Sequence, residues 1–198
     1  MLCAMSARLC VGLLSYRNST ASPNYTVVAA PEDPAHASEV KPEHIEVLLN
    51  LAAKHYDFVI IDAGRNLDAV TLKALDRADF IFPVLQLTMP FMRDASRLLA
   101  LFRALGYDKD KIRLLVNRFE KGGELALEDV KRTFGIDAYR TIPNSYQAVS
   151  SAVNQGRPIA SFARNNVVTK CLQELAQTLA RPAMSGNALL SRLLKRGA

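Results

Sequence analysis

Short, continuously apolar runs alternate with longer stretches of helical periodicity, and this alternation restricts the fold more than any other feature. Four runs have the length of a β-strand: Tyr25–Ala30, Phe58–Ile61, Phe80–Leu85 and Ile112–Val116. Continuous apolarity predicts strands that are buried on both faces, which is typical of a parallel sheet. A weaker fifth run, Ala138–Ile142, predicts an edge strand.

Helical patterns separate these runs. The predicted helices are Glu43–His55, Leu67–Asp76, Pro90–Leu105, Leu125–Phe134, Tyr146–Gln155 and Val167–Ala180. Strands that alternate with helices predict an α/β fold with a doubly wound, mostly parallel sheet and right-handed crossovers. Pro83 lies inside the third apolar run. Because proline lacks the N–H that a strand ladder needs, it predicts a bulge or an early strand end there.

Composition is that of a globular protein with one main domain. The chain has 198 residues, of which 49% are hydrophobic and 22% charged, and its net charge of +6 is spread without a long basic run. This charge gives no argument for a nucleic-acid partner. We assign residues 23–181 to the α/β domain, leave residues 1–22 unassigned and take residues 182–198 as a linker and tail.

Cysteine usage and hydropathy favour a cytoplasmic protein. The three cysteines have no pairing pattern and no Cys-x-x-Cys motif, which fits a reducing compartment. No apolar run approaches the ~20 residues of a membrane-spanning helix. The mildly apolar N-terminus lacks the features of a signal peptide, because Arg8 interrupts it.

Lys121-Gly122-Gly123 follows the fourth apolar run, but the segment is not a phosphate-binding P-loop. A P-loop requires Gly-Lys-Ser/Thr, so that the lysine reaches the phosphates and the hydroxyl holds Mg²⁺. Here the glycines are followed by Glu124, and further acids stand at Glu128 and Asp129. Acidic residues at a helix start would repel a phosphate.

Polar residues at the carboxyl ends of the predicted strands are the candidates for a site, because ligands of open parallel sheets bind there. Asp62-Ala63-Gly64 follows the second run. A carboxylate at this place can hold Mg²⁺ or its water, as in a Walker B motif, and the glycine permits a turn beside it. An aspartate that caps a turn is the alternative interpretation.

Two further strand ends carry polar residues. Asn117-Arg118 follows the fourth run, where an asparagine can offer a donor and an acceptor to a purine and an arginine can stack. Pro143-Asn144 follows the fifth run. Taken alone, these residues are equally compatible with side chains that satisfy turns.

The order of the motifs adds a resemblance. The series YDFVIIDAG, ADFIFPVLQL, PFMRDASRLL, RLLVNRFE and TIPNSYQAVSSAVNQGRPI resembles the MinD/ParA superfamily of P-loop ATPases over about residues 25 to 180. The segments LDAVTLKALDRAD, LQLTMPFMRDASRLL and IPN with AVNQGRPI resemble the CpaE/TadZ branch, whose members assist assembly and polar placement of tight-adherence (Flp, type IVb) pili. The resemblance implies a P-loop NTPase-like fold of the SIMIBI/MinD type.

The resemblance also implies roles for the candidate residues, with ATP and Mg²⁺ as cofactors. Asp62 would be the Walker B carboxylate and the magnesium ligand, and Gly64 would lie in the adjacent switch segment. Asn117 would contact the adenine with Arg118 beside it, while Pro143 and Asn144 would line the base, where many relatives have an acid.

The phosphate side departs from the family pattern. Relatives begin with a strand and a KGGxGKT loop, whereas residues 1–61 contain a single glycine, Gly12, followed by Leu13. We therefore expect an N-terminally incomplete domain that lacks the central strand of the sheet, either as a fragment, which we favour, or as a degenerate member. ATPase activity is the family's property, but we do not expect it of this chain.

The C-terminal tail has the pattern of a short basic amphipathic helix. Four leucines fall on one stripe and three cations lie off it: Leu189, Leu190, Leu193 and Leu194, with Arg192, Lys195 and Arg196. Such a helix can lie in a bilayer interface, with the cations at anionic headgroups. The tail also resembles the membrane-targeting tail of MinD-type proteins. A last helix that packs on its own domain is the alternative.

Together these features predict a pilus-localisation protein of the MinD/ParA type. We expect a homodimer in the cytoplasm, peripheral at the inner membrane or the cell pole, with pilus or secretion-apparatus proteins as partners. The alternatives are a nucleotide-free scaffold of a secretion apparatus at the membrane, and a chromosome- or plasmid-partitioning ATPase.

Overall fold

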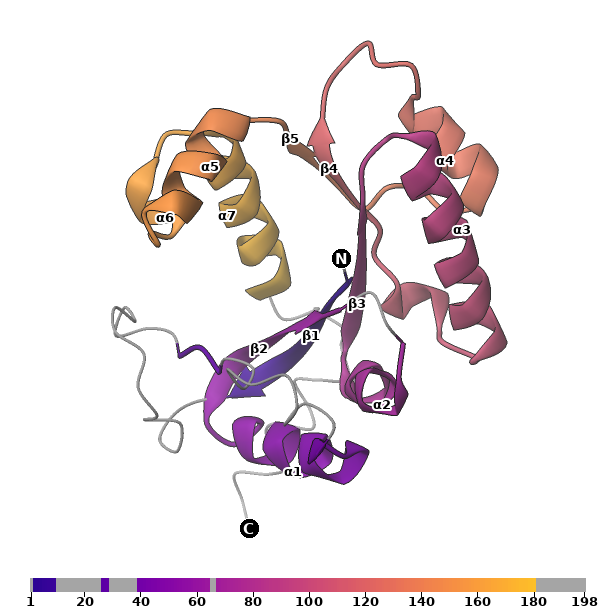
Figure 1. Cartoon of the computed structure of the whole chain (residues 1–198), viewed down its shortest axis with the longest axis vertical. Helices are drawn as coiled ribbons and strands as arrows, with labels where there is room; N and C mark the ends of the chain where they lie inside the picture. Colours follow the sequence, from indigo (N-terminus) through magenta and orange to yellow (C-terminus); the bar gives the residue numbers. More distant parts are fainter. Residues whose placement is uncertain (1, 10–25, 29–38, 65–66, 181–198) are drawn as a thin grey trace, which may run out of the picture. The chain divides into compact units, whose positions relative to one another are not determined.

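The structure is a computed structural model that describes residues 2–9, 26–28, 39–64 and 67–180, with residues 2–9 given as backbone (Figure 1). The chain divides into two compact units. The first comprises Met1–Asn117 with Lys121–Tyr139, and the second comprises Arg118–Glu120 with Arg140–Ala198. Each unit is described below on its own.

Five strands form the sheet, in the order β2-β1-β3-β4-β5. Their bounds are β1 Leu2–Leu9, β2 Tyr56–Ala63, β3 Phe80–Leu85, β4 Leu115–Phe119 and β5 Arg140–Pro143. β1 is antiparallel to both β2 and β3, and β3 is parallel to β4. β2, β3 and β4 therefore share one direction, and the predicted α/β fold with a mostly parallel sheet is confirmed.

β1 was not expected from the sequence. It lies inside the segment 1–22 and occupies the place between β2 and β3, where Ala4 is opposite Ile61 on one side and Ile81 on the other. The expectation that the sheet lacks its central strand is therefore wrong. A strand that is antiparallel to both neighbours satisfies their backbone groups as a parallel strand would.

The predicted strand Tyr25–Ala30 is not found where the structure describes it. Residues 26–28 have no regular secondary structure, and Val27 and Val28 are exposed. The rest of that run lies outside the described residues. An apolar run forms a strand only when a sheet edge pairs with it, and no described strand pairs with these residues.

The other strands were predicted to within a few residues, but their burial differs. β3 is largely buried, as continuous apolarity predicts. β2 instead alternates, with Phe58 and Ile60 exposed, because the described residues cover only one face of this strand, which lies at one edge of the sheet. Burial of β2 on both faces is thus a wrong prediction.

Pro83 lies within β3 without ending it, contrary to expectation. The antiparallel ladder with β1 ends at the pair Leu2 and Pro83, and the parallel ladder with β4 begins at the pair Val84 and Leu115. Proline is tolerated at this position because Pro83 is the last residue of β3 that is paired with β1.

The helices of the first unit are α1 Pro42–Ala52, α2 Ala69–Arg77, α3 Met89–Ala104 and α4 Leu127–Phe134, with a 3₁₀ turn, η2, at Lys109–Lys111. Local signals fix their ends. Asp68 caps α2 by accepting a hydrogen bond from the Thr71 N–H at 2.8 Å. α4 ends at Gly135, whose φ of 70° gives the left-handed conformation that glycine adopts without strain.

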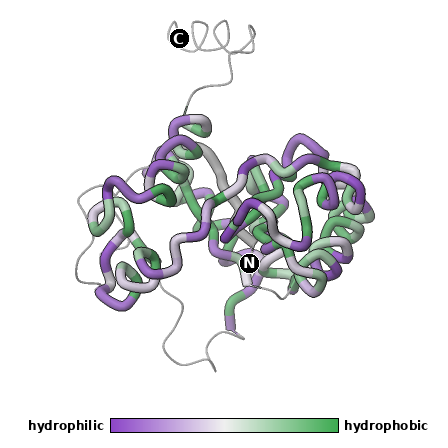
Figure 2. The backbone as a smooth tube through the Cα atoms, turned by 90° about the horizontal axis from the view of Figure 1, so that it is seen from above, coloured by the Kyte–Doolittle hydropathy of each residue, from purple (hydrophilic) through white to green (hydrophobic). Residues whose placement is uncertain are grey.

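Amphipathic helices build the core of the first unit. On α3 the buried residues recur at helical spacing, as Met92, Ala95, Leu99 and Phe102. Figure 2 shows hydrophobic and hydrophilic residues interspersed along the described helices, as expected when one face of each is buried. The most buried side chains include Leu75, Ile81, Phe102, Leu114, Val116 and Val130.

The second unit packs three helices with β5: α5 Tyr146–Asn154, α6 Ile159–Phe162 and α7 Val167–Ala180 (Figure 1). The buried Thr169 hydroxyl of α7 donates to the Ala163 carbonyl at 2.7 Å, just after α6. The Asn166 amide donates to the Ser145 hydroxyl at 2.9 Å, just before α5. These bonds fix the starts of α5 and α7 relative to each other.

Candidate functional site

Asp62 lies at the carboxyl end of β2, as predicted. It is exposed, and it shares one face of the strand with Ile60. Gly64 follows after the buried Ala63, and a Cβ added at Gly64 would meet nothing within 4 Å. The carboxylate thus faces solvent beside an open turn, where a hydrated cation could reach it.

Asn117 is the other predicted residue in the first unit. It is half-buried near the end of β4. Since β2 and β4 run in the same direction, Asp62 and Asn117 lie at the same edge of the sheet, separated by β1 and β3.

Strand register gives their separation. Asp62 is level with Phe82 through Cys3, whereas Asn117 follows the pair Leu85 and Val116. Three strand spacings amount to about 14 Å across the sheet, and four residues to about 13 Å along it, hence a separation on the order of 20 Å. The two side chains would therefore contact opposite ends of a bound ligand, in keeping with a metal role for one and a base role for the other.

The second unit brings the remaining predicted residues together. Asn144 donates its backbone N–H to the Phe119 carbonyl at 3.2 Å, and its side-chain amide donates to the Glu120 carboxylate. Pro143 precedes it at the end of β5 and is half-buried. The ends of β4 and β5 are thereby joined at the place predicted to line a base.

Arg118 holds an uncommon backbone conformation at this place. Its φ of 50° lies in the left-handed region, which costs free energy for a residue other than glycine and often marks functional sites. The guanidinium lies 5.7 Å from the centre of the Tyr146 ring, within the range of a cation–π contact. The arginine is therefore held over the first residue of α5.

Sequence reasoning missed Glu120 and Tyr146. The family pattern places an acid next to Pro143, whereas here an acid arrives from the neighbouring strand through the hydrogen bond between Glu120 and Asn144. The sequence pattern indicated Tyr146 only as the first residue of a predicted helix. In the structure it is 63% exposed. An exposed aromatic residue two positions after Asn144 was the available signal.

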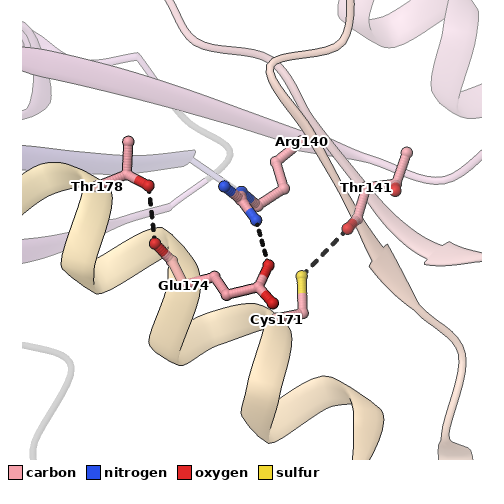
Figure 3. A network of polar contacts seen from close by, with 5 residues as sticks. All are labelled: Arg140, Thr141, Cys171, Glu174 and Thr178. Atoms are coloured by element: carbon pink, nitrogen blue, oxygen red, sulfur yellow. Dashed lines mark hydrogen bonds and ion pairs between the residues drawn. The ribbon is translucent and has the colours of Figure 1, made fainter.

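A polar network holds α7 against β5 behind this loop (Figure 3). Arg140 pairs with Glu174 at 3.0 Å, and the Thr178 hydroxyl donates to the Glu174 carbonyl at 2.8 Å. The Cys171 thiol donates to the Thr141 carbonyl at 3.2 Å. Burial raises the pKa of this thiol, so it stays protonated and acts as a donor rather than as a nucleophile.

The residues present fit a magnesium ion and a base better than they fit a triphosphate. Among the described residues no three of His, Cys, Asp and Glu gather as a metal site, so Asp62 would have to share the ion with phosphate oxygens and water. The chain contains no Gly-Lys pair, and Lys121-Gly122-Gly123 precedes the acidic start of α4 at Glu128 and Asp129. Nothing in the described residues supplies the backbone amides and lysine that bind phosphates.

Within the part of the chain that the structure describes, no helix has the length and apolarity needed to cross a membrane. The predicted tail, residues 188–196, lies outside the described residues.

Known proteins share the sequence pattern and the fold. No family model matches the chain. The septum site-determining protein MinD of Thermotoga maritima is 26% identical over 145 residues, which cover 71% of this chain and 53% of that protein. MinD of a Synechocystis strain is 23% identical over 186 residues, covering 88% of this chain and 68% of that protein.

Solved structures agree. A ParA family ATPase from Chlorobium tepidum superposes with a TM-score of 0.75 at 21% identity, covering 80% of this chain and 65% of that one. The chain has the MinD/ParA fold. MinD of Pyrococcus horikoshii, solved in complex with Mg-ADP, gives a TM-score of 0.60 at 17% identity and covers 75% of this chain.

The predicted MinD/ParA resemblance is confirmed at this level, since homologues and fold both agree. This MinD/ParA-like chain spans about half the length of the first curated relative, 53% of the Thermotoga protein. None of these relatives belongs by its name to the CpaE/TadZ branch.

Proposed function

We propose that this MinD/ParA-like chain is a CpaE/TadZ-type protein that positions the assembly of tight-adherence pili. The observation that supports the proposal is that three segments whose sequence resembles this branch fall on strands and helices of a MinD/ParA-like fold. LDAVTLKALDRAD spans α2, LQLTMPFMRDASRLL leads from β3 into α3, and IPN and AVNQGRPI begin in the last residues of β5 and of α5.

In this proposal the fold acts as a positioning platform. Asp62 and Gly64 supply the magnesium side of the family's ATP site, and Asn117, Arg118, Pro143 and Asn144 supply its base side. In the family pattern a KGGxGKT loop would supply the phosphate side of that site. The MinD structure of Pyrococcus horikoshii was solved in complex with Mg-ADP. This chain would instead recruit pilus or secretion-apparatus proteins, as a homodimer held peripherally at the inner membrane or cell pole by residues 189–196.

Two other functions remain candidates. Placement of the division septum is favoured by the names of the curated relatives, which are MinD proteins. Partition of a chromosome or plasmid is favoured by the superposition on a ParA family ATPase. Neither name carries over to this chain by fold alone.

Deletion of the gene in its host separates the three functions. The pilus proposal predicts a loss of surface pili by electron microscopy and of surface adherence, with normal septa and normal plasmid retention. Complementation by the full chain should restore the pili. Minicells in the deletion strain would favour septum placement, and loss of a resident plasmid would favour partition; either result with normal pili would contradict the proposal.

A pair of variants tests the role of nucleotide. Asp62→Asn removes the charge that a magnesium ion needs, and Asp57→Asn makes the same change at an exposed position earlier on β2. If the chain acts without nucleotide, both variants complement the deletion equally. Failure of Asp62→Asn alone would show that the magnesium side is in use.

A further inference from the structure

β2 has one edge that no described strand occupies. On its inner side β1 pairs with every residue of β2, from Tyr56 to Ala63. On the outer side the described sheet ends, because β2 stands first in the strand order (Figure 1). Residues 26–28, the described part of the apolar run before β2, have no regular secondary structure and do not pair there. The outer backbone groups of β2 are therefore open to a further strand.

β2 also lacks the features that protect the edges of natural sheets. Protected edge strands are short, or they carry a lysine, a proline or a bulge. The sequence of β2, YDFVIIDA, contains no lysine and no proline, and its ladder with β1 is unbroken. The other edge strand, β5, is only four residues long and ends in Pro143. β5 is thus a poor template for another strand, whereas β2 is a good one.

The side chains of β2 add apolar surface to this edge. Phe58 and Ile60 are 40% and 67% exposed on one face of the strand, and Val59 and Ile61 are half-buried on the other. A strand added beside β2 would cover part of all four, because directly opposite side chains lie on the same face with Cβ atoms about 5 Å apart.

Symmetry limits how a second copy of β2 can pair with the first. Two copies that use the same edge pair antiparallel about a two-fold axis normal to the sheet. Opposite residues then point to the same face, and because side chains alternate, odd-numbered residues meet odd-numbered ones and even-numbered residues meet even-numbered ones. One residue of β2 must therefore lie on the axis, opposite its own copy.

The register centred on Val59 suits the sequence best. It pairs the range from Tyr56 to Asp62 and sets Phe58 of each copy opposite Ile60 of the other, and aromatic and β-branched residues form favourable cross-strand pairs. Centring on Ile60 would set Phe58 opposite Asp62, and centring on any residue farther from the middle would shorten the ladder. The edge is thus complementary to itself, which favours a second copy as the occupant.

We propose that two copies of this chain join through their β2 strands, antiparallel, with Val59 on the two-fold axis. The sheet then continues from one copy into the other, as in strand addition. The inference rests on the proposed function only for the expectation of a homodimer, and the pilus role is tested separately by the gene deletion. One strand pair is small for an interface, so the dimer should be weak and dependent on concentration.

Cysteine trapping tests the register in the full chain. In Val59→Cys the two cysteines would lie opposite each other with Cα atoms about 4.5–5.5 Å apart, a distance that a disulfide bridges. Ile61→Cys is the matched control on the same half-buried face, because its two copies would be roughly 14 Å apart. Mild oxidation should give at least about fivefold more covalent dimer from Val59→Cys. A non-reduced tryptic digest should show the peptide 55–65 linked to itself.

Complementary charges test the pairing on the open face. Phe58→Lys and Ile60→Glu should each raise the dissociation constant of the homodimer by about tenfold or more in sedimentation velocity, because each sets a charge opposite an apolar residue. An equimolar mixture of the two variants should associate again, to within about threefold of wild type, since the two new charges then face each other. Val47→Lys is the control, because Val47 is 67% exposed on α1, away from β2, and this change should have less than about twofold effect.

The mixture also answers the objection that a variant fails to fold, because an unfolded chain would not be rescued by mixing. Three results would overturn the proposal. A wild-type chain that stays monomeric at all concentrations would exclude the dimer, and protection of the β2 amides from hydrogen exchange in that monomer would assign the edge to another segment of the same chain. Equal trapping of Val59→Cys and Ile61→Cys, or a mixture of charge variants that does not associate, would exclude this pairing.

Discussion

The Tyr107 hydroxyl donates a hydrogen bond of 2.7 Å to the Asp76 carboxylate, which connects the segment after α3 to the last turn of α2. Lys111 supports the same contact, because its ammonium donates to the Asp76 carbonyl at 3.1 Å and lies 5.1 Å from the Tyr107 ring centre. These contacts hold the end of α2 to the segment that follows α3. Phe102 of α3 packs against the Tyr107 ring at the same place.

Replacing Tyr107 with phenylalanine should lower the free energy of unfolding by about 1 kcal/mol, because the ring is kept and one hydrogen bond to a partly exposed charge is lost. Urea denaturation at neutral pH measures this. Tyr139→Phe is the matched control, since its hydroxyl accepts from Arg113 at 3.0 Å and touches no acid.

The same tyrosine predicts a pH dependence. Burial, with Asp76 beside it, raises the pKa of Tyr107 above its ordinary value of 10.0. Above pH 10 the unfolded chain therefore loses this proton while the folded chain keeps it, so the stability contributed by Tyr107 decreases as pH rises. The stability difference between wild type and Tyr107→Phe should shrink above pH 10; a constant difference would contradict the assignment.

Asp68→Ala should destabilise the first unit by about 1 kcal/mol, because Asp68 caps α2 through the Thr71 N–H. That hydrogen bond holds the pKa of Asp68 below its ordinary value of 3.8. The contribution is thus present above that pH and is lost as pH falls through the lower folded-state pKa. Asp68→Asn should keep most of the cap but not this acid dependence, and equal losses in both variants would rule out a capping role.

We expect copies of the chain to associate through β2. A homodimer was also expected from the resemblance to MinD/ParA proteins, without reference to β2. β2 is one of the two edge strands of the described sheet, and with Phe58 and Ile60 exposed its free edge can pair with a strand of another chain. Ile60→Lys should shift the chain from dimers or larger species toward monomer in sedimentation velocity, because an edge charge opposes pairing. Asp57→Lys adds positive charge on the same strand's other face and serves as control. A wild-type monomer at all concentrations would contradict this prediction.

The tail makes a prediction that rests on sequence alone, since residues 181–198 lie outside the described residues. Leu193→Glu should abolish sedimentation with anionic vesicles, because it removes apolar burial and adds repulsion. Arg192→Ala should weaken binding and make it less sensitive to salt. If a chain lacking residues 183–198 pellets as well as the full chain does, the tail is not the anchor.

The sequence predicted the parts of the fold that local patterns determine. β3 and α7 were predicted with the bounds that the structure shows, because an apolar run and a helical period each define an element without reference to the rest of the chain. β1 was missed for the converse reason. LCAMSARL alternates only weakly, and its pairing with β2 and β3 depends on contacts distant in sequence.

The candidate site likewise has residues that a local pattern predicts and residues that only the folded chain brings together. Asp62 and Asn144 were found as polar residues at strand ends, which is a local signal. Glu120 and Tyr146 come to their places only through a hydrogen bond to Asn144 and a stack with Arg118, which no spacing in the sequence encodes. Sequence patterns therefore locate the ends of strands, but not which neighbouring side chains complete a site there.

Nucleotide binding by the chain tests the account most directly. Under the proposal Asp62 and Asn117 would orient a nucleotide, but no lysine or set of backbone amides in the described residues would neutralise its phosphates. Isothermal titration calorimetry with Mg-ATP should therefore show binding no tighter than millimolar, and equally weak binding for Asp62→Asn. Micromolar binding that Asp62→Asn abolishes would show that the chain holds a phosphate site, and it would contradict the view of this chain as a positioning platform that works without ATP.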